Sequence, residues 1–281
     1  MDGALQGKTA IITGASRGLG LEIAKIFAGN GADIVFCSRS ENHAAEAAKL
    51  IRESSNRADI KVIPVIADMA SEADIDRLIE TTVRKCGSFD ILVNNAAIQG
   101  PIGLIDENDW DEWKDTLITD MFGPVYAMRQ TIAFFKKNGI RGKIINISGG
   151  GATGSRPNFS AYAAAKVAIV RLTEILADEN KEYGIDINSI APGAMRSAMT
   201  DEIMKAGEAA GDKEIAVAEK LIREGDTCKE KAAGLALFLA SEKSNGITGR
   251  LISAVWDDWG TLDSRKGELT KDLYTLRRIA E

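Results

Sequence analysis

The feature that most constrains the fold is a regular alternation of short apolar segments with longer segments of helical spacing. Seven apolar segments, rich in β-branched residues, predict strands: Thr9–Thr13, Asp33–Cys37, Lys61–Ile66, Ile91–Asn94, Lys143–Ile147, Ile185–Ile190 and Arg250–Val255. Helical spacing is found between them, for example over residues 19–28, 41–53, 72–85 and 161–182. Strands that are apolar on both faces and separated by helices are typical of a parallel sheet covered on both sides. We therefore predict an α/β fold, a single doubly wound domain with a seven-stranded parallel sheet.

Composition and charge argue against several classes of function. The 281 residues carry a net charge of −6, with a pI near 5.2, so a nucleic-acid partner would be repelled. No apolar run reaches the roughly 20 residues that span a membrane, and the start, MDGALQGK, lacks the apolar core of a signal peptide. Cys37, Cys86 and Cys228 are widely separated, which favours free thiols and a cytoplasmic location. Because His43 is the only histidine, a histidine-based hydrolase or a His-ligated metal site is poorly supported.

Two segments depart from the alternation. Residues 201–227 are charged, contain several glycines and follow the sixth predicted strand. They could be a solvated pair of surface helices, but we favour a mobile lid, because ligands of open α/β sheets bind beyond the carboxyl ends of the strands. Residues 256–281 form a C-terminal tail with two large aromatic side chains, Trp256 and Trp259. We expect these to pack against the body of the chain or against a partner subunit.

The first predicted strand runs directly into TGASRGLG, Thr13–Gly20. Glycines at positions 14, 18 and 20 allow a tight turn, a close approach of the backbone to a phosphate, and close packing of the next helix on the strand. The amino end of that helix favours the negative charge of the phosphate. Since the motif lies between a strand and a helix, as such a motif must, it predicts a dinucleotide site.

A second motif, YAAAK, places Tyr162 and Lys166 four residues apart in a predicted helix. Residues at this spacing share one face of a helix. A neighbouring ammonium favours the phenolate form of a tyrosine, which suits the side chain to proton transfer. The pair is therefore a candidate for acid–base chemistry.

Four motifs stand in the order and spacing of one known family: TGASRGLG, NNAA (Asn94–Ala97), Tyr162-x-x-x-Lys166 and PGAMRS (Pro192–Ser197). From about Lys8 to Val255 the chain resembles the short-chain dehydrogenase/reductase family. The resemblance implies a Rossmann-like fold, a nicotinamide cofactor, a small-molecule carbonyl or alcohol substrate, and a homo-oligomer, either tetramer or dimer. Residues 1–255 would form the dinucleotide-binding and catalytic domain.

The end of the second strand distinguishes NAD from NADP, because an acid there binds the ribose whereas a cation receives the additional phosphate. Ser38 and Arg39 occupy this position, and Arg17 in the glycine loop can reach the same phosphate. We therefore predict NADP. The full set of cofactor contacts, in large part implied by the resemblance, is Gly14, Ser16, Arg17, Gly18, Leu19, Gly20, Ser38, Arg39, Asp68, Met69, Asn94, Ala96, Tyr162, Lys166, Pro192, Gly193 and Ser197.

Two positions depart from the family pattern. Asp120 replaces the family's asparagine, a tolerable change because a carboxylate can also bind water and a lysine. Gly149 replaces the serine that contacts the substrate oxygen, thirteen positions before the tyrosine. Either another group, such as Ser148, Thr153, Ser155 or a backbone N–H of the glycine run, supplies the donor, or the missing side chain makes room for the substrate. Ser148 is our first choice, although a shift of one residue along an extended strand reverses the side chain.

The sequence thus predicts an NADP(H)-dependent oxidoreductase whose catalytic residues are Tyr162, Lys166, Ser148 and Asp120. The alternative is an NADP-binding regulatory or scaffold protein with little turnover. The resemblance places the substrate pocket at residues 98–105, 152–159, Met195, Met199 and the 201–227 insertion. Arg156 would either meet an anionic substrate or be a surface arginine. The pattern does not choose between ketone, sugar and acyl substrates.

Overall fold

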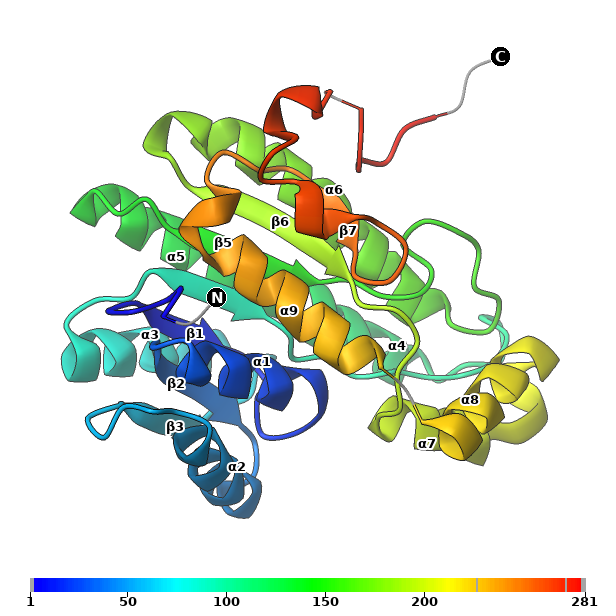
Figure 1. The fold of residues 1–281 in the computed structure, drawn as a ribbon. Coiled ribbons are helices and arrows are strands. Elements are labelled where there is room, and N and C mark those ends of the chain that lie inside the picture. The colour runs from blue at the N-terminus through cyan, green and yellow to red at the C-terminus, as the bar shows by residue number, and fades with distance from the viewer. Residues whose placement is uncertain (1–2, 226, 271, 279–281) are drawn as a thin grey trace.

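The computed structural model describes residues 3–225, 227–270 and 272–278. Seven strands pair in parallel in the order β3-β2-β1-β4-β5-β6-β7 (Figure 1). Their bounds are β1 Thr9–Ile12, β2 Asp33–Ser38, β3 Val62–Ile66, β4 Ile91–Asn94, β5 Lys143–Ile147, β6 Asp186–Ala191 and β7 Leu251–Ser253. The predicted doubly wound α/β fold is confirmed, and every predicted strand lies within two residues of an observed one.

Helices connect the strands and cover both faces of the sheet. Among the described residues they are α1 Gly18–Gly29, α2 Glu41–Glu53, α3 Glu72–Cys86, α4 Trp110–Leu117, α5 Gly123–Asn138, α6 Ser160–Asn180, α7 Ala198–Ala206, α8 Asp212–Glu224 and α9 Cys228–Ala240. A π-helical turn, η1 (Ile118–Phe122), joins α4 to α5. None of the described helices is long and apolar enough to cross a membrane.

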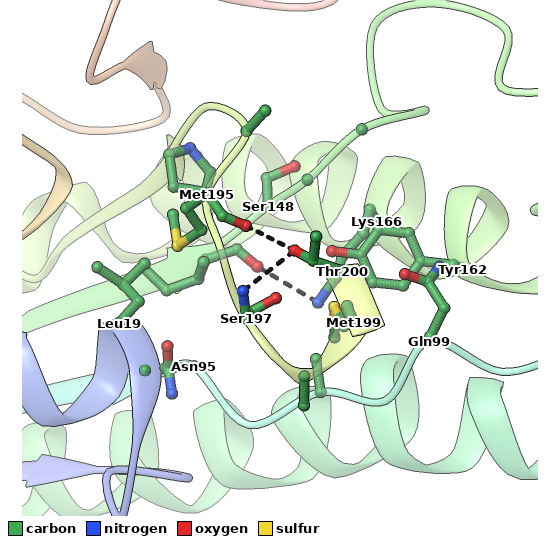
Figure 2. A pocket seen from close by; sticks show the side chains of 18 of the residues that line it. Leu19, Asn95, Gln99, Ser148, Tyr162, Lys166, Met195, Ser197, Met199 and Thr200 are labelled. Carbon is green, nitrogen blue, oxygen red and sulfur yellow. Dashed lines mark hydrogen bonds between the residues drawn. The ribbon is translucent and has the colours of Figure 1, made fainter. Parts of the chain in front are cut away.

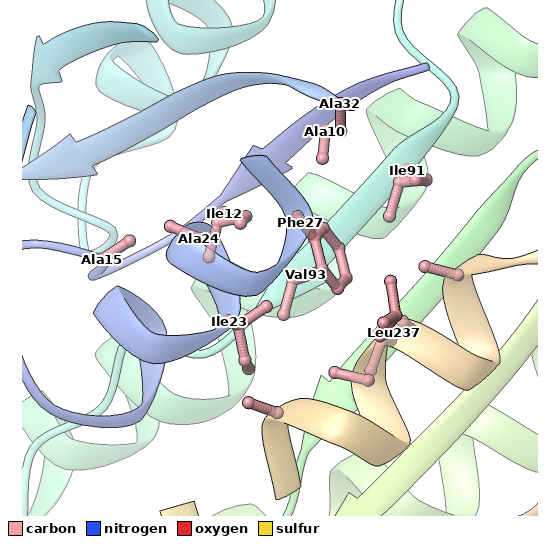
Figure 3. Close-up of a cluster of buried hydrophobic side chains, with 14 of the residues drawn as sticks. Ala10, Ile12, Ala15, Ile23, Ala24, Phe27, Ala32, Ile91, Val93 and Leu237 are labelled. Atoms are coloured by element: carbon pink, nitrogen blue, oxygen red, sulfur yellow. The ribbon is translucent and has the colours of Figure 1, made fainter. Parts of the chain in front are cut away.

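Two buried apolar clusters hold the helices to the sheet. In the first, α1, α2 and α9 pack on one face, where Phe27 of α1 lies against the strands and near Leu237 of α9 (Figure 3). In the second, α3, α5 and α6 cover the opposite face, with Phe135 of α5 among its fully buried residues. Because both faces are covered, most strand residues are apolar, which is the pattern that predicted the sheet.

The order of the strands determines where a ligand can bind. β1 lies beside both β2 and β4, so the connections on its two sides run in opposite directions across the sheet. This is a topological switch point, and it leaves a crevice beyond the carboxyl ends of β1 and β4. Gly14 follows β1 and Asn95 follows β4 at this crevice, so the chain brings two of its motifs together there.

Helices α7 and α8 of the 201–227 insertion form a small unit with its own core. Ile203, Ala210 and Ala218 are buried against Phe159, which belongs to the loop before α6. The insertion therefore covers the loop that carries the glycine run. Its movement as a lid stays a prediction.

The C-terminal tail lies along the edge strand β7 and helix α6 (Figure 1). Leu251 donates its N–H to the Tyr274 carbonyl at 2.8 Å, and Arg171 of α6 donates to the Leu276 carbonyl at 2.8 Å. Trp259 donates its indole N–H to the Ala254 carbonyl and packs against Phe238 of α9. Trp256 instead is 86% exposed, so it does not pack on the body; its packing against a partner subunit stays a prediction.

A buried ion pair fastens the amino ends of the strands, at the edge opposite the crevice. Lys143 Nζ, at the start of β5, lies 2.6 Å from Asp186 Oδ2 at the start of β6. The Gly246 N–H and the Ser244 hydroxyl complete the group, at 3.1 Å from Asp186 and 3.2 Å from Lys143. Burial, partly opposed by Asp186, lowers the pKa of Lys143 below its ordinary value of 10.5. Removing one partner would leave an uncompensated buried charge.

Asp186→Asn should therefore lower the free energy of unfolding by about 3–5 kcal/mol, measured by urea denaturation at pH 7. The loss of unfolding free energy in the variant should shrink as the pH rises towards 10.5. In this range Lys143 binds its proton more tightly in the unfolded chain than in the folded one, so the free energy of unfolding rises with pH. Asp178→Asn, an exposed change on α6, is the control. Equal stability of the two variants would contradict the assignment.

Candidate active site

A cavity of about 1180 Å³ lies beyond the carboxyl ends of β1, β4, β5 and β6. It extends from Arg39 after β2, past Tyr162 and Lys166 on α6, to Glu214 on α8 and Trp256 in the tail. Figure 2 shows side chains from the glycine loop, the loop after β4, α6 and the loop after β6 around the same space. The four sequence motifs thus meet in one place, although they lie far apart along the chain.

Most of the predicted site residues line this cavity. Tyr162, Lys166 and Ser148 do so, as do all the predicted cofactor contacts except Gly20 and Asn94. Asp120 does not reach the cavity surface; it is fully buried behind Lys166. Asn94 is also buried, and its side-chain amide donates to Asn146 Oδ1 of β5 at 2.9 Å. Asn94 therefore joins β4 to β5, and Asn95 stands nearer to the cavity.

The glycine loop is held to the loop after β4. Gly14 has a φ of +66°, and a Cβ atom there would lie 2.9 Å from the Cα of Ala96. Asn95 donates its side-chain N–H to the carbonyls of Thr13 and Gly14, at 2.9 and 3.2 Å. A Cβ atom on Gly20 would lie 2.4 Å from that amide nitrogen. The glycines are thus needed for the close approach of two loops, and Asn95 is the residue that the sequence reasoning missed.

Two arginine side chains extend at the β2 end of the cavity. Arg17 and Arg39 are exposed and line the cavity, and their guanidinium groups form no hydrogen bond or ion pair within the part of the chain that the structure describes. Ser38 lies between them in the lining but donates its hydroxyl to the Ser40 carbonyl at 3.1 Å. Burial raises the pKa of Glu202 on α7 above its ordinary value of 4.5, and the charge of Arg17 opposes this shift. This end of the cavity offers two cations to an anionic group.

Lys166 is anchored by a buried ion pair. Its Nζ lies 3.4 Å from Asp120 Oδ2 and 3.4 Å from the Ile147 carbonyl, and the Ile98 N–H donates to Asp120 Oδ1 at 2.8 Å. Burial raises the pKa of Asp120, against the attraction of Lys166. Burial also opposes the charge on Lys166, but Asp120 and Tyr162 more than offset it and raise the pKa of Lys166 above 10.5. The two groups that contact the Asp120 oxygens, the Ile98 N–H and the Lys166 ammonium, are both donors, which favours the ionised form of the pair.

Two cations flank the ring of Tyr162. Lys166 Nζ lies 5.2 Å from the ring centroid, and the Arg156 guanidinium lies 5.5 Å from it. Arg156 also stacks on Phe159 at 4.0 Å and forms a two-pronged ion pair with Glu214 of α8, at 3.1 and 2.8 Å. Arg156 is therefore a paired and largely buried residue rather than a surface arginine. Its partner Glu214 was not singled out in the sequence, because their contact joins segments 58 residues apart.

The structure gives Gly149 a reason that neither sequence explanation contained. A Cβ atom at this position would lie 2.3 Å from the Tyr162 hydroxyl and 2.9 Å from its ring. Real Cβ atoms do not approach that closely, so the tyrosine itself fills the space where a side chain would begin. A side chain at position 149 would therefore require the Tyr162 hydroxyl to move, and the two sequence explanations stay predictions.

Among the alternative donors, Ser148 is distinguished by its surroundings. It follows β5, is 2% exposed, lines the cavity, and its hydroxyl has no hydrogen-bond partner within the described ranges. Thr153 and Ser155 also line the cavity, but both are exposed. A buried hydroxyl without a partner is uncommon, because the lost hydration is not replaced.

Other residues line the cavity whose individual positions there did not follow from the sequence. Glu202 and Glu214 come from the insertion, and Trp256 and Asp257 from the start of the tail. Gln99 was expected among the polar residues of the substrate pocket; it is 2% exposed, and its amide nitrogen has no partner among the described residues. Only the packing of the insertion and the tail on the body brings these side chains to the cavity.

Comparison with known proteins agrees with this geometry. The family profile described as short chain dehydrogenase matches residues 8–208. L-2,3-Butanediol dehydrogenase of Corynebacterium glutamicum is 31% identical over 252 residues, covering 87% of this chain and 96% of that enzyme. 3beta-Hydroxysteroid dehydrogenase 1 of Eggerthella lenta is 33% identical over 247 residues, covering 87% and 91%. The structure of NAD+-bound xylitol dehydrogenase has a TM-score of 0.79 at 24% identity, covering 89% of this chain and 98% of that one.

If Gly149 makes room for Tyr162, then Gly149→Ala should lower kcat/KM of the predicted oxidoreductase activity about 10²-fold, because the tyrosine hydroxyl must move by roughly an ångström. The measurement is the steady-state rate with a nicotinamide cofactor and a panel of carbonyl compounds. Gly154→Ala is a matched control in the same loop, since no atom lies within 4 Å of its new Cβ atom. An unchanged rate in Gly149→Ala would refute this explanation.

Proposed function

The chain belongs to the short chain dehydrogenase family, and from this premise we propose that it is an NADP(H)-dependent oxidoreductase with Tyr162 as its acid/base. As a member of the family it is an oxidoreductase that acts on alcohols or carbonyl compounds. The observation that carries the proposal is the common cavity. The Tyr162 and Lys166 pair opens onto the same space as the glycine loop and its two arginines.

The residues present suit NADP. Gly14 and Gly18 of the glycine loop line the cavity, and α1 begins within the loop at Gly18, so the amino end of a helix favours a phosphate there. Arg17 and Arg39 would bind the additional phosphate of NADP, since guanidiniums bind phosphate oxygens through paired N–H donors. The absence of an acid at Ser38 removes the residue that would bind the ribose of NAD. Xylitol dehydrogenase, which has a similar fold, binds NAD+, so the fold does not distinguish the two cofactors. The choice of NADP over NAD therefore rests on these side chains.

Tyr162 would transfer the proton of the reaction. When bound, the nicotinamide supplies a hydride to the carbonyl carbon or takes one from the alcohol. Tyr162 then gives its hydroxyl proton to the substrate oxygen, or removes one in the reverse direction. Lys166 and Arg156 would stabilise the negative charge that develops on the phenol oxygen, and the ion pair with Asp120 keeps Lys166 charged and in place. Ser148 would donate a hydrogen bond to the substrate oxygen in place of the family's serine.

The insertion would act as the cover of this site. Helices α7 and α8 line the cavity, and the Arg156–Glu214 ion pair joins them to the loop before Tyr162. Opening of the lid would break that ion pair, and closure would remove water from around Tyr162. We also propose, from the family resemblance, that the protein is a homo-oligomer and that the exposed Trp256 packs at a subunit interface.

Tyr162→Phe removes the proposed proton donor and keeps the ring. We expect turnover to fall by about 10²–10⁴-fold, the usual contribution of a general acid, with NADPH affinity retained. The measurements are NADPH oxidation across a ketone and sugar panel and NADPH binding by fluorescence titration. Tyr183→Phe, at an exposed tyrosine outside the cavity, is the control. Tight NADPH binding without turnover of any compound by the wild type would favour the regulatory or scaffold alternative.

Arg39→Ala tests the cofactor. The variant should weaken NADPH binding by about 10- to 100-fold, the value of lost hydrogen bonds to a charged group, and leave NADH binding nearly unchanged. Arg84→Ala removes the same charge from an exposed position on α3, away from the cavity. Equal losses for NADPH and NADH in Arg39→Ala would overturn the assignment of NADP.

A further inference from the structure

Gln99 is a buried residue whose side chain forms no hydrogen bond with the rest of the described chain. It lies in the loop after β4, is 2% exposed and lines the cavity, where Figure 2 draws it with Tyr162 and Lys166. Its amide nitrogen has no hydrogen-bond partner within the described residues, and none of their hydrogen bonds uses its amide oxygen. The amide nitrogen has thus lost its hydration without gaining a contact, which is unfavourable unless something else binds it.

The position of Gln99 is nevertheless closely fixed. On one side, the Ile98 N–H is bonded to Asp120, the carboxylate that anchors Lys166. On the other side, Gly100 has a φ of +68°, and a Cβ atom there would lie 2.1 Å from the hydroxyl of Thr116 on α4. The loop is therefore held at both neighbours of Gln99, and one of the two contacts is shared with the proposed catalytic group. Such support is what a side chain needs in order to present a hydrogen-bonding group at a defined place.

The distribution of partnerless buried polar atoms points to the cavity. Within the part of the chain that the structure describes, residues with such atoms include Asn30, Asn94, Gln99, Asp120, Thr131, Ser148 and Asn180. Only two of these residues line the cavity, Gln99 and Ser148. Ser148 is already assigned to the substrate oxygen that Tyr162 protonates. The Gln99 amide, the second such group in the cavity, could be satisfied by a second oxygen on the substrate.

From these observations we infer that Gln99 binds a second oxygen of the substrate, so that the substrate class is a hydroxylated ketone or polyol rather than a simple ketone or alcohol. This inference rests on the proposed function. A side-chain amide both donates and accepts, and therefore suits a hydroxyl group, which does the same. A compound without the second oxygen leaves Gln99 buried and unpaired, and sites built to bind a hydroxyl reject analogues that lack it strongly.

The test uses pairs of compounds that differ by one hydroxyl group: butan-2-one with 3-hydroxybutan-2-one, and cyclohexanone with 2-hydroxycyclohexanone. We expect the wild type to show a kcat/KM at least about 10²-fold higher for the hydroxylated member. In Gln99→Met and Gln99→Leu this ratio should fall to near one, through loss of rate with the hydroxylated compound alone. Two variants are used, with melting temperatures measured, so that a folding defect in one does not decide the result. Gln6→Met, at an exposed glutamine outside the cavity, is the control.

Two results would overturn the inference while leaving the proposed function in place. One is wild-type turnover of both members at similar kcat/KM; the other is an equal loss for both members in the Gln99 variants. Failure of the wild type to turn over any compound, in these pairs or in the wider ketone and sugar panel, would instead reject the proposed function and the inference with it.

Discussion

The buried ion pair between Asp120 and Lys166 is the interaction on which the rest of the site depends. It joins η1 to α6, while the Ile98 N–H and the Ile147 carbonyl connect it to the loops after β4 and β5. Two side chains thus join the segments that follow β4 to those that follow β5. A buried ion pair is costly unless other polar groups also contact it, and here the Ile98 N–H binds Asp120 Oδ1 and the Ile147 carbonyl accepts from Lys166. The carboxylate at this position is consequently part of the architecture as well as of the proposed chemistry.

The glycine run Gly149–Gly151 lies close against other residues of the site. A Cβ atom on Gly149 would meet Tyr162, one on Gly150 would lie 3.3 Å from Arg156, and one on Gly151 would lie 2.5 Å from Cβ of Ala163. The loop therefore packs its bare backbone against the start of α6. This close packing lets Arg156 stack beside Tyr162 and reach Glu214 of the insertion. The loss of the family's serine and the position of the tyrosine are two aspects of one packing arrangement.

Local patterns were sufficient to predict the fold, and the family resemblance implied most of the cavity lining. The seven strands follow from apolar runs of four to six residues, and the glycine loop and the Tyr162–Lys166 pair follow from short fixed spacings. Asn94 shows the limit of that reasoning: its motif was found, but its amide turns to Asn146 inside the sheet, and Asn95 holds the glycine loop instead. Neighbouring residues point to opposite sides of a strand, and a motif alone does not say where the strand ends.

By itself the sequence determined the doubly wound sheet, the dinucleotide loop and the pairing of Tyr162 with Lys166, because each depends on periodicity or on residues within one turn of a helix. The tertiary structure decided why position 149 is a glycine, that Arg156 is paired with Glu214, and that Ser148 and Gln99 are buried without partners. These features depend on contacts between segments tens of residues apart. Such contacts exist only once the sheet has brought the loops at its carboxyl edge together.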